Sequence, residues 1–200
     1  MIWPIVATLG FFFYLFFSWR RLRDDYTSDR TFSAAFVIIG LIILSQILVW
    51  YFGLMYLWFW AAVASSVGAF VLVLKRFRFK FYESLEAFGV GLLIPYAAAF
   101  LAHGIASSRP DSLVGFLVVL AVFGLFFFLD KRYRRFTWYR SGRVGFSGLT
   151  VLGFLFLIRA VVALFFPSVL SFSGGLETVM SAVLAFVLFL LLYNLSQKSV

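Results

Sequence analysis

Seven apolar runs separated by short loops take up almost the whole chain. They cover residues 2–18, 31–52, 54–74, 84–106, 112–129, 146–166 and 174–194. A helix needs about 20 apolar residues to cross the hydrocarbon core of a bilayer, and roughly 17 to 25 are tolerated. Every run fits that range, and none shows the alternation of polar and apolar residues that a barrel strand requires. The sequence therefore predicts an all-α integral membrane protein of about seven transmembrane helices, forming one polytopic domain over residues 1–200.

The composition agrees with lipid as the main solvent. Of the 200 residues, 64% are hydrophobic and 12% are charged, whereas roughly a quarter of the residues in a soluble domain are charged. The absence of Cys and the presence of a single His argue against a disulfide framework and against a thiolate or histidine metal site. We therefore expect no cofactor. The net charge of +9 lies in short loops, so nucleic acid is not an expected partner.

Basic residues alternate from loop to loop along the chain. Arg109 is the only basic residue in the loops expected on one side of the membrane. Fifteen lie in the loops and tail expected on the other: Arg20, Arg21, Arg23, Arg30, Lys75, Arg76, Arg78, Lys80, Lys131, Arg132, Arg134, Arg135, Arg140, Arg143 and Lys198. Cytoplasmic loops carry the excess of Lys and Arg in membrane proteins. The pattern predicts an outside N-terminus and a cytoplasmic C-terminus. Between the second and third runs the chain either turns in a tight hairpin near Gly53 or continues as one long bent segment. The hairpin is favoured, because a single helix through both runs would overshoot the bilayer about twofold.

Three polar residues within the apolar runs are candidates for a functional site. Arg159 lies about seven residues from the end of the sixth run, a depth at which a charge costs a few kcal/mol and usually marks a function or a partner. The alternative is that its long side chain snorkels to the outer head groups. His103 and Tyr96 lie in the fourth run, where Pro95 frees a backbone carbonyl one turn earlier. Glu177 begins the seventh run and either caps its own helix or pairs with Arg159.

Other polar residues in the runs have structural interpretations. Gln46, Ser65 and Ser66 are expected to hydrogen-bond between helices. Glu83 and Glu86 are expected to cap the fourth helix and to pair with the adjacent basic stretch. Small residues at the start of the sixth run allow close helix approach: Gly145, Gly148 and Gly153.

Three stretches resemble the prolipoprotein diacylglyceryl transferases. LGFFFYLFFSWRRLRDD is similar to the first span of that family and its basic exit, and LKRFRFKFYESLEAFGVGLLIPYAAAFLAHG to its basic loop and fourth span. RSGRVGFSGLTVLGFLFLIRAVVALFFP is similar to the arginine-bearing sixth span. Two motifs differ. The third span, LWFWAAVASS, lacks the His-Gly-Gly of the family, and Ala97 stands at an arginine position of its fourth span.

The resemblance implies a multi-pass protein of the plasma (inner) membrane that transfers diacylglyceryl from phosphatidylglycerol to a lipobox cysteine. Phosphatidylglycerol and prolipoprotein signal peptides are the partners it implies. Arg159 would bind the lipid phosphate and stabilise the departing glycerol phosphate, His103 would act as the base, and Tyr96 would contact the lipid. A non-catalytic lipid-binding or partner-binding protein on the same scaffold is the alternative. In a third interpretation, the chain is a structural subunit whose Arg159 pairs with a carboxylate of another protein.

Overall fold

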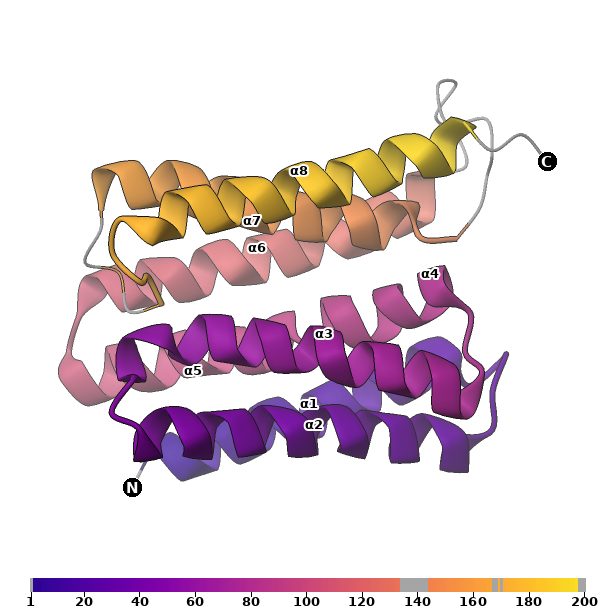
Figure 1. Ribbon diagram of the computed structural model, residues 1–200, viewed down its shortest axis with the longest axis horizontal. Coiled ribbons are helices and arrows are strands. Elements are labelled where there is room, and N and C mark those ends of the chain that lie inside the picture. The colour runs from indigo at the N-terminus through magenta and orange to yellow at the C-terminus, as the bar shows by residue number, and fades with distance from the viewer. Residues whose placement is uncertain (1, 134–143, 167–168, 170, 198–200) are drawn as a thin grey trace.

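The computed structural model describes residues 2–133, 144–166, 169 and 171–197, and all its regular elements are helical (Figure 1). Among these residues, seven helices are long and apolar enough to cross a membrane. The prediction of an all-α, multi-pass membrane protein is confirmed to that extent. The elements are α1 (Ile2–Leu22), α2 (Ser28–Tyr51), the 3₁₀ turn η1 (Met55–Leu57), α3 (Trp58–Phe77), α4 (Phe81–Ser84), the π turn η2 (Leu85–Gly89), α5 (Leu93–Ser107), α6 (Pro110–Arg132), α7 (Phe146–Phe165) and α8 (Leu176–Gln197).

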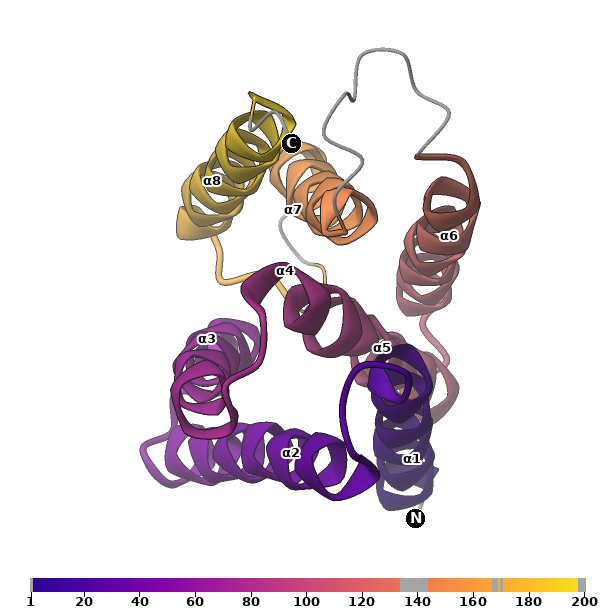
Figure 2. The same cartoon turned by 90° about the vertical axis from the view of Figure 1, so that its right-hand side faces the viewer.

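The long helices lie in two layers, with α1, α2, α3 and α5 in one and α6, α7 and α8 in the other (Figures 1 and 2). Packing runs through neighbouring pairs, from α3 to α2, α1, α5, α6, α7 and finally α8. The π turn η2 packs on both α1 and α7 and so links the layers. Helices α3 and α8 stand at the two ends of this series, on the same side of the molecule in Figure 2.

The helical structure is interrupted at Gly53 and near Pro95. Gly53 has φ +70°, the left-handed conformation that glycine adopts without strain, and this confirms the predicted hairpin between α2 and α3. The fourth span consists of α4, η2 and α5, with a turn at Leu92. Pro95 has no N–H to donate, so the helical hydrogen bond to the carbonyl one turn earlier is missing near that turn.

Polar residues between α2 and α3 hydrogen-bond as expected. The Gln46 amide donates to the Trp58 carbonyl at 3.0 Å. Ser65 lies 3.1 Å from the hydroxyl of Ser45 across the helix pair. Ser66 instead donates to the carbonyl of Ala62 within α3. Two of the three predicted interhelical residues therefore have that role.

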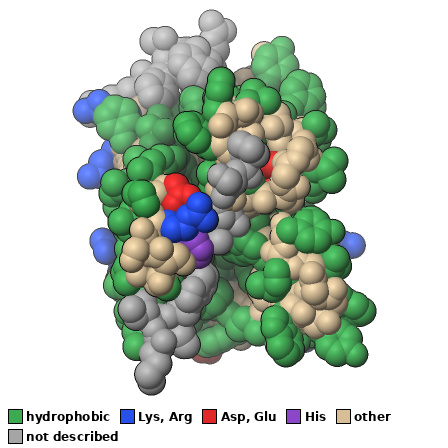
Figure 3. Space-filling view, turned by 90° about the vertical axis from the view of Figure 1, so that its left-hand side faces the viewer, with side chains coloured by type: hydrophobic (Ala, Val, Ile, Leu, Met, Phe, Trp, Pro, Cys, Tyr) green, Lys and Arg blue, Asp and Glu red, His purple; other side chains and the backbone are tan. Residues whose placement is uncertain are grey.

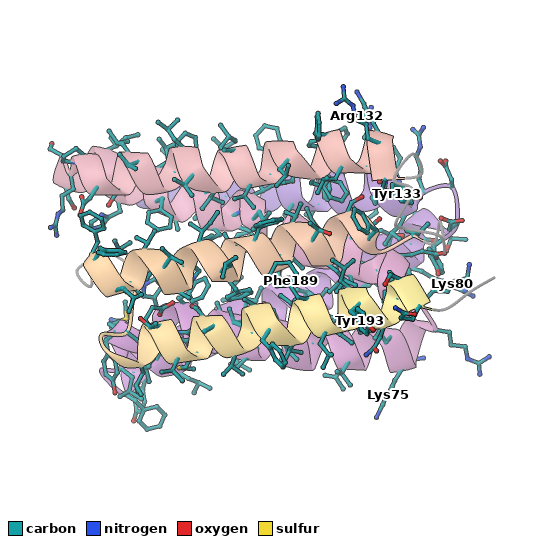
Figure 4. The ribbon with its side chains drawn as sticks, turned by 90° about the horizontal axis from the view of Figure 1, so that it is seen from above. Lys75, Lys80, Arg132, Tyr133, Phe189 and Tyr193 are labelled. Carbon is teal, nitrogen blue, oxygen red and sulfur yellow. The ribbon has the colours of Figure 1, made fainter. Side chains whose placement is uncertain are left out.

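Basic side chains gather at one end of the bundle, where Figure 4 shows Lys75, Lys80 and Arg132 together. The opposite end carries the α2–α3, α5–α6 and α7–α8 connections and shows mostly apolar and uncharged polar side chains (Figure 3). The loops therefore separate by charge as the sequence predicts. The basic residues that lie outside the described residues are Arg134, Arg135, Arg140, Arg143 and Lys198.

Candidate functional site: a buried ion pair beside an apolar cavity

Arg159 of α7 forms an ion pair with Glu177 of α8, away from lipid and from water. The Nη2 atom of Arg159 lies 2.5 Å from Oε1 of Glu177, and the side chains are 4% and 0% exposed. Both residues are near the end of the bundle where α7 leads into α8, and these two helices pack closely. The pairing resolves the two alternatives for Glu177 in favour of Arg159. It also excludes the snorkelling interpretation, because the guanidinium points into the bundle.

Glu177 accepts hydrogen bonds from three further residues. The indole N–H of Trp60 in α3 donates to Oε2 at 2.8 Å, and the Ser181 hydroxyl donates to Oε1 at 2.7 Å. The backbone N–H and the hydroxyl of Ser173 make longer contacts with Oε2, both 3.4 Å. Each carboxylate oxygen therefore has at least two donors, which is the condition under which a charge is tolerated in a low-dielectric interior.

The guanidinium of Arg159 has neutral partners as well. Nη1 donates to the Tyr96 hydroxyl and to the Ser171 hydroxyl at 2.7 Å, while Nη2 donates to the Ser171 carbonyl at 3.1 Å. Its planar face lies over the ring of Phe59, with Cζ 3.5 Å from the ring centroid. Only Nε lacks a partner within the described part of the chain.

This network joins four helices at one point. Arg159 comes from α7, Glu177 from α8, Tyr96 from α5 and Trp60 from α3. Because α3 and α8 are the two ends of the packing series, the Trp60–Glu177 bond joins these ends. The pairing also removes the reason for assigning Arg159 to a carboxylate of another protein, since this chain supplies one.

A cavity of about 720 Å³ lies directly beside the network. Phe59, Tyr96 and Phe156 belong to its wall and also surround the ion pair, because Arg159 lies on Phe59 and bonds Tyr96 while Trp60 stacks on Phe156. The rest of the wall is almost entirely apolar and comes from α1, α2, η1, α3, η2, α5, α7 and α8. Gln46 and Ser66 are its other polar members. None of the lining side chains carries a charge.

His103 is placed apart from this network. Its Nδ1 atom lies 2.8 Å from the hydroxyl of Ser112 at the start of α6. His103 follows Tyr96 by two helical turns, about 10 Å along the axis of α5. His103 lies near the end of α5, and the Arg109–Asp111 pair, at 3.5 Å, lies at the connection from α5 to α6. The structure thus brings Arg159 and Tyr96 together but gives His103 a different partner.

A second charged network lies at the basic end of the bundle. Glu83 pairs with Lys80 at 3.0 Å as expected. Glu86 does not cap its own helix, which corrects the expectation for this residue. Its Oε1 accepts the backbone N–H groups of Gly145 and Gly148 at 3.0 and 3.2 Å, at the N-terminus of α7.

The cation that pairs with Glu86 comes from the end of α1 and not from the adjacent basic stretch. Nη2 of Arg21 lies 2.6 Å from Glu86 and 2.7 Å from Asp130. A Cβ on Gly148 would lie 2.7 Å from Cγ of Glu86, so this glycine permits the close approach. A carboxylate at the positive end of α7 is favourable, and the π turn places Glu86 there.

Residues that hold the ion pair include several that carry no sequence signal. Trp60 and Phe59 read as ordinary apolar residues of the third run, and Ser171 reads as part of a loop. Only the depth of Arg159 indicated that donors and acceptors had to gather around it. No group of His, Cys, Asp and Glu suited to a metal ion occurs among the described residues.

Comparison of the chain with family models, with curated proteins and with solved structures finds no match.

Proposed function

We propose that the cavity holds the hydrocarbon chain of a membrane lipid and that the protein is a non-catalytic lipid-binding membrane protein. The observation that carries this proposal is the uncharged, almost wholly apolar wall of a 720 Å³ space within a bundle of seven apolar helices. Ligand sites of about 300–1,000 Å³ with mainly apolar linings bury most of a ligand of this size.

Lipid can enter the cavity from the side. The wall includes residues 63, 66, 67 and 70 of α3 and residues 184 and 188 of α8. The neighbours packed closely on these helices are α2 for α3 and α7 for α8. Val67 is 54% exposed although it lines the cavity, so the cavity reaches the lipid-facing surface along α3. An acyl chain from the bilayer reaches this opening without crossing water.

The ion pair forms the polar end of the site. Arg159 is neutralised by Glu177, so no free charge faces the cavity. The amide oxygen of Gln46 and the hydroxyl oxygen of Ser66 can accept a hydrogen bond from a lipid hydroxyl, because their own hydrogens already bond Trp58 and Ala62. The paired state therefore favours a ligand whose buried portion is uncharged.

Filling the cavity tests this function directly. Ala62→Trp places an indole in the cavity, whereas Ala64→Trp puts the same side chain on the exposed face of the same helix. Each purified variant is given a defined phospholipid in detergent, and native mass spectrometry counts retained lipid. The wild type and Ala64→Trp should retain a lipid that Ala62→Trp loses. Equal retention in all three proteins would contradict the proposal.

A second candidate function is diacylglyceryl transfer, as the family resemblance implies. It is favoured by one observation, the contact between Arg159 and Tyr96 at one end of the cavity. Catalysis by this site requires Arg159 to exchange Glu177 for the phosphate of phosphatidylglycerol, which a guanidinium binds bidentately. It also requires His103 or another base to reach the incoming thiol.

Cells depleted of their own prolipoprotein diacylglyceryl transferase test that alternative. The wild-type chain and Arg159→Gln are expressed to equal levels, and modification of a prolipoprotein is followed. If lipid binding without catalysis is the function, neither protein modifies the substrate. Modification by the wild type, lost in Arg159→Gln, would establish the transferase and overturn the non-catalytic proposal.

We further propose that the chain lies in the plasma membrane with its N-terminus outside and its basic end in the cytoplasm. The support is the alternation of basic loops. The chain has no Cys, so single cysteines can be introduced without background. In intact cells, a membrane-impermeant maleimide should label Ser107→Cys and spare Asp24→Cys. The reverse pattern would refute this orientation.

A further inference from the structure

A second cleft, of about 410 Å³, lies at the basic end of the bundle. Helices α1 and α6 form its walls, and each packs on α5, from which Ile94 contributes to the lining. We call it the α1–α6 groove. Most of its other lining residues are phenylalanines: Phe13, Phe16, Phe17, Phe123, Phe126 and Phe127.

The phenylalanines form an apolar track that faces lipid. Phe13 and Phe16 of α1 are 61% and 52% exposed, and Phe127 of α6 is 45% exposed. Phe17 lies between the walls and meets Phe123 edge-on, with ring centroids 5.3 Å apart. Aromatic contact of this kind fixes the spacing of the walls. The track suits an extended hydrocarbon chain.

Of the two arginines at the end of the groove, one is paired with carboxylates and the other is not. Arg21 is fully engaged, since it donates to both oxygens of Asp130 at 2.9 and 2.7 Å and also to Glu86. Arg21 and the two carboxylates together carry one net negative charge, and Glu86 is also stabilised by the backbone N–H groups at the start of α7. Arg20 lines the same groove, is exposed, and has no hydrogen bond or ion pair within the described residues.

Further cations lie close by. Lys131 and Arg132 follow Asp130 at the end of α6, and both are exposed. Arg20, Lys131 and Arg132 outnumber the single net negative charge of Arg21, Glu86 and Asp130, so this end of the bundle carries an excess of positive charge. A hydrocarbon track that ends at a surplus of cations matches one class of molecule, an amphiphile with an anionic head group. Each basic residue near an anionic membrane surface contributes about a factor of five to binding.

We propose that the α1–α6 groove binds an anionic glycerophospholipid, with one acyl chain along the phenylalanines and the phosphate at Arg20. This site is separate from the cavity beside Arg159, because the two share no lining residue, and its charged end lies at the opposite end of the bundle from the Arg159–Glu177 pair. The cavity recognises the hydrocarbon chain of its lipid, whereas the groove recognises the negative charge of the head group.

The test uses the full chain carrying Ala62→Trp, so that the groove is measured without the cavity. Native mass spectrometry compares binding of phosphatidylglycerol and phosphatidylcholine with the same acyl chains. Arg20→Gln should weaken phosphatidylglycerol binding about fivefold and phosphatidylcholine binding less, because the choline ammonium offsets the charge of that lipid's phosphate. Arg76→Gln, which removes an exposed arginine of α3 at the same end of the bundle, should change the binding of neither lipid. Phe13→Ala should weaken both lipids, because it shortens the shared apolar track.

Two results would overturn the proposal. One is equal binding of the two lipids by the protein with intact Arg20. The other is an equal loss of phosphatidylglycerol binding in Arg20→Gln and Arg76→Gln, which would mean that only the total charge matters. Neither result bears on the cavity, whose ligand is tested by comparing the wild type with Ala62→Trp.

Discussion

Replacing Glu177 by Gln leaves Arg159 charged and buried without its counter-ion. The substitution keeps the shape of the side chain, so the change is mainly electrostatic. Breaking a buried ion pair by removing one partner costs about 3–5 kcal/mol, and the exposures of 4% and 0% place this pair in that class. In a chain of about this length, 1 kcal/mol shifts the unfolding temperature by about 2–4 °C. We therefore expect Glu177→Gln to unfold roughly 10 °C below the wild type.

Thermal unfolding in detergent, followed by tryptophan fluorescence, measures this loss, and a double-mutant cycle isolates the pair. Arg159→Met should be destabilised to a similar extent, because it leaves Glu177 charged and unpaired. The double variant leaves neither charge, so its loss should be smaller than the sum of the single losses by about 2 kcal/mol or more. Ser173→Ala removes only the hydroxyl contact at 3.4 Å and should change stability by less than about 0.5 kcal/mol. A loss in the double variant equal to the sum of the two single losses would refute the ion-pair argument.

Three further predictions concern the basic end of the bundle. Gly148→Ala should lose about 1–3 kcal/mol of stability by overpacking against a buried carboxylate, while Gly40→Ala, which meets nothing within 4 Å, should lose none in the same thermal assay. Arg21→Gln should lose about 3 kcal/mol of stability by leaving Glu86 without its cation. Arg23→Gln, from an exposed pair, should lose less than about 1 kcal/mol. Equal losses in the two variants would contradict this contrast. Burial raises the pKa of Tyr26, so the folded chain keeps this phenol neutral above the pH at which the unfolded chain ionises. Its contribution to stability should be complete below about pH 10 and fall above it, and Tyr26→Phe should remove this fall in unfolding measured against pH.

The long helices could be predicted from the sequence because a bilayer imposes its thickness on every apolar run. The hairpin at Gly53 followed from the same constraint, since one helix through both runs would be about twice too long. The π turn at Leu85–Gly89 could not be predicted in this way. It arises where Glu86 reaches the N-terminus of α7, a contact 59 residues away in sequence. Periodicity within one span carries no information about that partner.

The candidate site was predictable only at its charged centre. A buried guanidinium in a membrane must find an acceptor. Pairing with Arg159 was one of the two roles that the sequence allowed for Glu177. Trp60 and Phe59 were not identified, because an aromatic residue in an apolar run looks the same whether it faces lipid or an ion pair. His103 was selected as the lone imidazole, but its hydrogen bond is with Ser112. Which polar residues of different spans meet depends on helix rotation, which short loops leave undetermined.

The central claim is that the cavity between α3 and α8 holds a lipid chain, and a structure of the protein determined in lipid nanodiscs tests it most directly. We expect elongated density along Val63, Val67 and Leu184, ending near Tyr96 with the Arg159–Glu177 pair intact. An empty cavity, or side chains of α3 packed against α8 with no space between them, would contradict the claim.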